Sequence, residues 1–341
     1  MRATFLILFC LLAAVPAWPQ AHPRAQAPGA THGQLDSSET LFTVMAAINA
    51  AGYDAEIDNP ANSPVRKAVR DHLKSLNLPV VEELRRFVHA HKQTDPGADL
   101  SQYISYALVI DGPPDFGRHY ANIVPPDVEG LEGLTPLIVR FYREANIAGL
   151  WKQVEPQYDE MIAGLSRPIA RAVLQVNAYL RHDTAGYLGR NFQIYVDLMG
   201  APNQVQMRSY VDDDYVVVTP ASEPHIDQIR HAYLHYLLDL LPMKFSDAVK
   251  QKHALGDYAL GSPILEQQFK SDFMLLTAEC LIKAVESRLD KQPAEVEQAL
   301  REGFVLTPAI AEQLPAYEAQ EASMRLYFPT LVDGIDLKRE E

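Results

Sequence analysis

Apolar residues recur every three or four positions along most of the chain, which is the spacing of helices that bury one face. In residues 37–54 this apolar stripe consists of Leu41, Val44, Met45 and Ile48. The same spacing runs through residues 62–76, 79–92, 100–110 and 134–154, and through a long segment from residue 156 to about residue 182. The first half of the protein is therefore predicted to consist of amphipathic helices that pack on one another.

Prolines mark the start of one of these helices and the middle of another. Ser63 followed by Pro64 is typical of a helix start, because serine caps free backbone N–H groups and proline fits the first turn. Pro168 lies in the middle of the long segment. Because proline lacks the N–H of the helical hydrogen bond, we expect a kink or a break into two helices there.

The spacing of apolar residues changes to two after residue 190. Residues 191–200 alternate apolar and polar side chains, with Phe192, Ile194, Val196 and Leu198 on one side. Two further short runs, 204–211 and 215–220, follow the turn sequences Ala-Pro-Asn and Asp-Asp-Asp. Three short runs separated by tight turns predict an antiparallel β-meander.

Helical spacing returns after the third run. Ser222 is the expected N-cap of a helix with the sequence RHAYLHYLLDLLP, and Pro224 fits its first turn. Residues 264–289, 293–304 and 309–332 also have helical spacing. We therefore predict an α+β, mostly α-helical fold: a helical N-terminal region (37–183), a region with the meander and the histidine helix (184–305), and a C-terminal helical tail (306–341).

The N-terminus has the pattern of a secretory signal peptide. Arg2 precedes an apolar run over residues 5–15, which is too short to span a bilayer, and small residues follow. A signal peptide (1–21) and a flexible linker rich in Pro, Ala and Gly (22–36) predict an exported protein, periplasmic or extracellular, without a stable membrane anchor after cleavage. The net charge of −14 argues against nucleic acid or an anionic membrane as partner, since both bind basic surfaces.

Candidate metal ligands lie on two of the later helices. His231 and His235 are one helical turn apart, so both imidazoles can reach the same metal ion. Glu279 lies in the middle of an apolar helical run, where a carboxylate needs a partner. A bound cation would provide that partner. His231, His235 and Glu279 are therefore candidate ligands, and zinc is the candidate metal.

Each of these residues also has a purely structural interpretation. The two histidines would then pack beside Tyr233 and Tyr236, and Glu279 would form an ion pair with a lysine or arginine from another segment. Two histidines four residues apart also arise by chance, so the spacing does not decide between the interpretations.

The strand meander, the His-x-x-x-His helix and the downstream glutamate together resemble the gluzincin class of zinc metallopeptidases. More narrowly, the chain is similar to poorly characterised bacterial exported proteins with a helical N-terminal half and a peptidase-like second half. The segments LFTVMAAINAAGYD and LIVRFYREANIAGLWKQVEPQYDE and the histidine helix carry this similarity. The resemblance implies zinc held by His231, His235 and Glu279, and a peptide or protein as ligand.

The sequence departs from that class at the position of the general base. In a His-Glu-x-x-His helix, the glutamate accepts a proton from the zinc-bound water, but here Ala232 occupies its position. Asp227 and His225 are the nearby substitutes, and Asp227 is also a candidate for orienting a ligand imidazole. Asp239 is expected on a solvated helix face, and Glu286 is expected to be structural or to support the site.

Three functions stay open on the sequence. The resemblance, with its missing base, favours a zinc-binding pseudo-peptidase retained to bind a peptide or a partner. The alternatives are an active zinc-dependent peptidase with a substitute base, and a helical structural or binding module in which the histidines are incidental. The chain has no Gly-rich phosphate loop, Gly-x-Ser-x-Gly motif or Cys-x-x-Cys pair, so nucleotide use, serine hydrolysis and thiol redox chemistry lack support.

Overall fold

A computed structural model describes residues 35–120, 124–182 and 189–340 of the chain. The predicted signal peptide (1–21) and the predicted linker up to residue 34 lie outside the described residues. The last two residues assigned to the linker, Leu35 and Asp36, instead belong to a short strand, β1 (Leu35–Ser37). The described residues form an α+β, mostly helical fold, as predicted, and belong to one compact unit.

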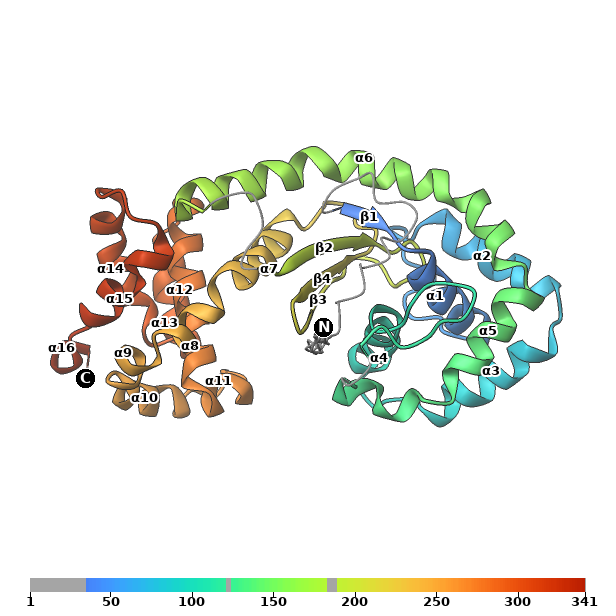
Figure 1. The fold of residues 1–341 in the computed structure, drawn as a ribbon, viewed down its shortest axis with the longest axis horizontal. Helices are drawn as coiled ribbons and strands as arrows, with labels where there is room; N and C mark the ends of the chain where they lie inside the picture. Colours follow the sequence, from blue (N-terminus) through green and yellow to red (C-terminus); the bar gives the residue numbers. More distant parts are fainter. Residues whose placement is uncertain (1–34, 121–123, 183–188, 341) are drawn as a thin grey trace, which may run out of the picture. The chain divides into compact units, whose positions relative to one another are not determined.

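Helices follow β1 at the predicted places (Figure 1). Ser38 and Ser63 cap the first two of them, accepting hydrogen bonds from the backbone N–H groups of Leu41 and Val65. The first helix is buried over almost its whole length and packs against the third and fourth. The elements are α1 (Glu39–Ala51), α2 (Pro64–Ser75), α3 (Pro79–Ala90), α4 (Pro96–Leu108), the 3-10 helix η1 (Pro126–Leu131) and α5 (Leu134–Glu144).

The long helix α6 (Ile147–Leu180) differs from the prediction in two ways. It begins after Asn146, which adopts a left-handed conformation (φ 48°) and separates α5 from α6 inside the segment predicted as one helix. It then continues through Pro156 and Pro168, so that of the expected kink or break at Pro168, the break into two helices is wrong. Its buried stripe keeps helical spacing across both prolines, and packing therefore holds the helix together where a hydrogen bond is lost.

The strands β2 (Asn191–Val196), β3 (Val205–Tyr210) and β4 (Asp213–Val218) form where predicted, but they do not form a meander. The sheet order is β1-β2-β4-β3, with β2 parallel to both β1 and β4, and only β3 and β4 antiparallel. β2 and β4 are more buried than β3, whose side chains are mostly half-buried. The two apolar strands therefore share the centre of the sheet, and β3 lies at its edge.

The second half starts with α7 (Ile226–Leu238), the histidine helix. The predicted N-cap is wrong: the helix begins four residues after Ser222, and His225 takes the cap position without a side-chain cap hydrogen bond. One face of α7 packs against α6 and the sheet, and the other faces α12 (Phe273–Leu289). The helix predicted over 264–289 is divided at Asp272, whose extended backbone and carboxylate cap α12.

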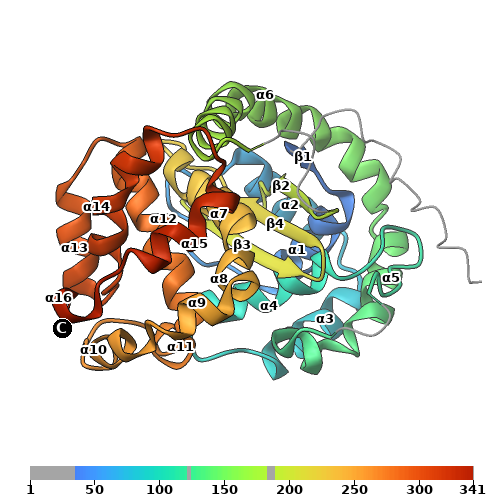
Figure 2. The same ribbon diagram turned by 60° about the vertical axis from the view of Figure 1, so that its left-hand side comes forward.

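In the second half, α12 contacts α7, α8, α9, α11, α13 and α14, and α15 packs on α14 and α9 (Figure 2). Because α14 packs directly on α12, the segment predicted as a C-terminal tail is part of the core. None of the described helices combines the length and the apolar character that crossing a bilayer requires. The elements are α8 (Leu240–Lys244), α9 (Ser246–Lys250), the 3-10 helix η2 (His253–Leu255), α10 (Gly256–Leu260), α11 (Gln267–Ser271), α13 (Ala294–Glu302), α14 (Thr307–Glu318), α15 (Met324–Asp333) and α16 (Leu337–Glu340).

Candidate metal centre

The tyrosines of α7 point away from its histidines. Tyr233 packs edge-on against Phe192 of β2 and donates a hydrogen bond to the side chain of Asn177 on α6. Tyr236 also contacts Phe192. The tyrosines thus anchor α7 to the sheet and to α6, while the two histidines, one turn apart, lie on the face toward α12. The histidines are therefore not explained by packing beside the tyrosines.

Glu279 meets both histidines from α12, as predicted. The His231 and His235 Nε2 atoms lie 3.1 Å apart. Glu279 Oε1 lies 3.8 Å from His231 Nε2, and Glu279 Oε2 lies 3.2 Å from His235 Nε2. The carboxylate side chain is only 5 % exposed, whereas the imidazoles are 34 % and 16 % exposed. Three potential ligand atoms therefore converge on one partly open point.

The separations of these atoms fit a small tetrahedral metal ion. Ligands about 2.1 Å from a zinc ion lie roughly 3.4 Å from one another in a tetrahedron. The two Nε2 atoms are 3.1 Å apart, and each imidazole has a different oxygen of the Glu279 carboxylate near that distance, Oε2 at 3.2 Å from His235 and Oε1 at 3.8 Å from His231. In the described structure, the buried Glu279 Oε2 atom has no hydrogen-bond partner, although it lies within ion-pair distance of His235 Nε2. A metal ion at this point would satisfy that oxygen.

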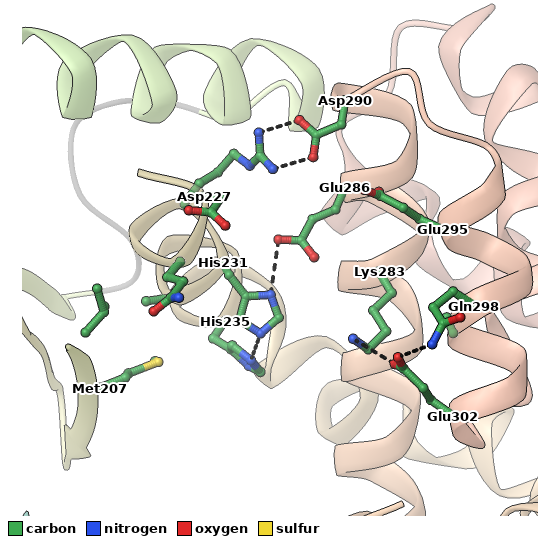
Figure 3. A pocket seen from close by; sticks show the side chains of 15 residues that line it. Met207, Asp227, His231, His235, Lys283, Glu286, Asp290, Glu295, Gln298 and Glu302 are labelled. Atoms are coloured by element: carbon green, nitrogen blue, oxygen red, sulfur yellow. Dashed lines mark hydrogen bonds and ion pairs between the residues drawn. The ribbon is translucent and has the colours of Figure 1, made fainter. Parts of the chain in front are cut away.

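Carboxylates hold the opposite nitrogen of each imidazole. His231 Nδ1 lies 3.1 Å from Glu286 Oε1 on α12, and His235 Nδ1 lies 2.9 Å from Asp239 Oδ1 at the end of α7. A carboxylate that accepts a hydrogen bond from Nδ1–H keeps the proton on Nδ1 and leaves the Nε2 lone pair free to bind a metal. Both histidines therefore present Nε2 to the same point, as Figure 3 shows for their facing rings.

The electrostatics of the cluster favour a positive charge. Burial alone would lower the pKa of His235, but the carboxylates of Asp239 and Glu279 raise it to about 10. Burial alone would raise the pKa of Glu279, but the imidazoles of His235 and His231 and the Lys283 ammonium lower it to about 2. A carboxylate kept ionised in a buried place needs a cation: the Lys283 ammonium supplies one on the Oε1 side, and a proton on an imidazole or a metal ion would supply another.

The expected positions of the other site residues are only partly confirmed. Ala232 is 3 % exposed and lines the cleft beside the histidines, so no base projects from this position. Asp227 is exposed at the start of α7, and the carboxylate that contacts His231 is Glu286. Asp239 was expected on a solvated face but holds His235. His225 caps α7, and its Nε2 is buried without a hydrogen-bond partner in the described structure.

Lys283 is a residue of the site that sequence reasoning missed. Its ammonium lies 3.4 Å from Glu279 Oε1, 3.9 Å from Glu302 Oε2 and 4.5 Å from the centre of the Phe304 ring. The spacing of four residues between Glu279 and Lys283 on one helix was the signal available in the sequence. Glu302 comes from the end of α13, which no pattern in the sequence linked to the histidines.

The centre opens into two clefts. One, of about 540 Å³, is bounded by α7, α12, α13 and the edge strand β3 (Figure 3). The other, of about 570 Å³, is lined by the segment 264–269 and by residues of α12 and α13. His231, His235, Lys283 and Glu302 line both clefts. Both volumes lie in the range of small-ligand sites. A ligand in either cleft can therefore reach the metal point, by which we mean the space between His231 Nε2, His235 Nε2 and the Glu279 carboxylate.

No family model matches the chain, and no curated protein or solved structure matches it either. The resemblance to gluzincins therefore stays a prediction from the sequence, and the function must be inferred from the geometry of the site.

Proposed function

We propose that the protein binds a zinc ion through His231, His235 and Glu279, and that it is a metallopeptidase-like protein that binds a peptide and is impaired as a hydrolase. The convergence of three ligand atoms, with one buried carboxylate oxygen left unpartnered, carries the proposal. Three protein ligands and an open fourth position are typical of zinc sites that bind a water or a ligand. The predicted signal peptide would place this activity outside the cytoplasm.

The impairment follows from the side chains around the open position. A zinc ion held there would polarise a carbonyl group or acidify a bound water. Hydrolysis also needs a base beside that water, and Ala232 provides none. Glu286 and Asp239 lie behind the imidazoles, and Lys283 stands next to Glu279, with Glu302 beyond it. This arrangement supports binding of a ligand at the metal more than cleavage of that ligand.

Metal analysis of the purified protein tests the zinc site. We expect about one tightly bound zinc per chain, which is lost in His231→Ala and in Glu279→Gln. The matched control is His253→Ala, because His253 lies on η2, away from both clefts. A protein that binds no zinc, or that keeps its zinc in both variants, would refute the proposed function.

The substitution Ala232→Glu tests the impairment. With zinc bound, we expect the wild-type protein to leave casein-like peptides uncut and Ala232→Glu to cleave them, because the new carboxylate accepts the proton of the metal-bound water. Ala232→Gln is the control, since it has nearly the same shape without the base. Hydrolysis by the wild type that a chelator abolishes would instead identify an active peptidase with a substitute base.

A further inference from the structure

The two clefts that meet at the metal centre differ in character. The cleft between α7 and α13 is lined by five carboxylates, by Arg230 and Lys283 and by the two histidines, whereas the cleft next to α11 combines polar side chains with the exposed Ile264 and with Phe269. A ligand that spans both clefts would therefore meet a mainly acidic surface on one side and a mixed surface with apolar side chains on the other. This inference rests on the proposed zinc site, where the buried Glu279 Oε2 atom has no hydrogen-bond partner in the described structure.

The charge of the acidic cleft is only partly neutralised within the protein. Asp290 forms a bidentate ion pair with Arg230, and Glu302 lies near Lys283. In the described part of the chain, the Asp227 and Glu295 carboxylates form no hydrogen bond or ion pair. Burial and the nearby carboxylates raise the pKa of Glu295, which shows how closely the negative charges are placed.

The other cleft offers a hydrophobic contact. Phe269 and Phe304 pack edge to face, with ring centres 5.3 Å apart, and Leu265 is buried beside them. Ile264 is 64 % exposed at the same cleft. Glu266 and Gln268 also line this cleft, so Ile264 and Phe269 offer an apolar contact within a mixed surface, and a hydrophobic group of a ligand would cover it.

We propose that the ligand is a peptide segment that carries a basic residue next to an apolar one, and that it lies across the metal point. Its basic side chain occupies the acidic cleft near Glu295 and Asp227, and its apolar side chain covers Ile264 and Phe269. A backbone carbonyl between the two lies at the open metal position. Charge complementarity selects the basic residue, and removal of apolar surface from water selects its neighbour.

Calorimetric titration of the zinc-loaded protein with short synthetic peptides tests this proposal. The set contains a Lys-Lys pair beside a leucine in both orders, the same peptides with Glu in place of Lys, and the same peptides with Ser in place of Leu. We expect at least one Lys/Leu order to bind about tenfold more tightly than its Glu and Ser counterparts, and its affinity to fall as salt is raised. Zinc content is measured in every preparation.

Surface substitutions assign each preference to its cleft. Glu295→Gln should weaken the preference for Lys over Glu at least threefold, whereas Glu297→Gln on the exposed face of the same helix should not. Ile264→Ser should weaken the preference for Leu over Ser, whereas Leu326→Ser, equally exposed but on α15, should not. All four residues are at least partly exposed, so the variants should fold normally.

The outcomes separate this proposal from the proposed function. A protein without zinc would overturn both. A zinc-loaded protein that binds none of the peptides, or binds all of them equally, would leave the metal site standing and overturn the ligand assignment. Preferences that persist in Glu295→Gln and Ile264→Ser would show that the peptides bind elsewhere and would also overturn it.

Discussion

The two carboxylates behind the imidazoles orient the zinc ligands in the proposed site. Glu286 holds His231 and Asp239 holds His235, each through Nδ1. A carboxylate in this place fixes the tautomer that presents Nε2 to the metal, and it makes the imidazole a stronger ligand. The two contacts also keep both rings facing Glu279, so they lower the cost of assembling the three ligands.

Removing either contact should therefore weaken zinc binding without abolishing it. We expect Glu286→Ala and Asp239→Ala each to lower the affinity for zinc about 10- to 100-fold, as measured by competition with a chelating dye. Glu286→Gln should have a smaller effect, because its amide oxygen still accepts the hydrogen bond. Asp227→Asn is the control, since Asp227 is exposed and does not contact the histidines. Unchanged affinity in both alanine variants would contradict this role.

At the residue scale, the sequence predicted the cluster of His231, His235 and Glu279 better than its surroundings. His231 and His235 follow from helical spacing, and Glu279 follows from the cost of a carboxylate in an apolar run. The role of Asp239 was missed because an acid one turn after a histidine is more often simply solvated. The contact of Glu302 with Lys283 joins α13 to α12, and the packing of two helices cannot be inferred from the pattern along either one.

At the scale of elements, α6 shows packing overriding local preference. The residues buried along it keep the spacing of a single helix through both prolines: Ile147, Leu150, Trp151, Val154, Tyr158, Ile162, Leu165, Ile169, Ala172, Val176, Asn177 and Leu180. A break at Pro168 would remove half of that stripe from its partners. Local sequence rules predicted a kink or a break because they include the lost hydrogen bond but not the tertiary contacts.

The proline should nevertheless reduce stability, because the carbonyl of Gly164 has no N–H donor at position 168. We expect Pro168→Ala to increase the free energy of unfolding by about 2 kcal/mol, the proline penalty being partly offset by the greater freedom of the unfolded chain. Urea denaturation measures the change, and Arg167→Ala, an exposed neighbour, should stay within about 0.5 kcal/mol of the wild type. Equal stabilities of Pro168→Ala and wild type would mean that the helix has relaxed around the proline.

The sheet shows a second limit of local patterns. Short apolar runs located the three strands of the second half approximately, although β4 begins at Asp213, inside the predicted Asp-Asp-Asp turn. The short turns also suggested that neighbours in sequence pair in the sheet. Instead, the apolar strands β2 and β4 pair in parallel and leave β3 at the edge. The strand order is set by the burial of the apolar side chains of β2 and β4 at the centre of the sheet. The connection between β2 and β3 is long enough to be compatible with that order.

At the scale of the whole molecule, a buried polar network joins the N-terminal helices to the sheet. Asp197, at the end of β2, accepts a hydrogen bond from the Met199 N–H, and the Met199 carbonyl accepts one from Asn49 on α1. Arg66 on α2 donates to Asn49 in turn. Asp197 is fully buried, and its Oδ2 has no hydrogen-bond partner in the described structure. The network thus links three elements at the cost of burying a carboxylate.

This buried carboxylate should make stability depend on pH. Burial raises the pKa of Asp197 to about 6, although the Met199 N–H and Arg66 act in the opposite direction. The folded protein therefore binds a proton that the unfolded chain has already released between about pH 4 and pH 6. Protonation of Asp197 therefore contributes on the order of 3 kcal/mol to the free energy of unfolding below about pH 4. This contribution is lost as the pH rises through about 6.

Asp197→Asn should remove that dependence, because an amide does not titrate but still accepts the Met199 hydrogen bond. In urea denaturation at pH 4, 5, 6 and 7, we expect the stability of Asp197→Asn relative to wild type to rise up to about pH 6 and then to level off. Asp58→Asn is the control, because Asp58 is exposed and lies in the segment between α1 and α2. Its free energy of unfolding should change with pH in parallel with that of the wild type. Parallel curves for Asp197→Asn as well would mean that Asp197 stays ionised across this range. In that case the positive charge of Arg66 would stabilise the ionised Asp197 carboxylate enough to outweigh the effect of burial.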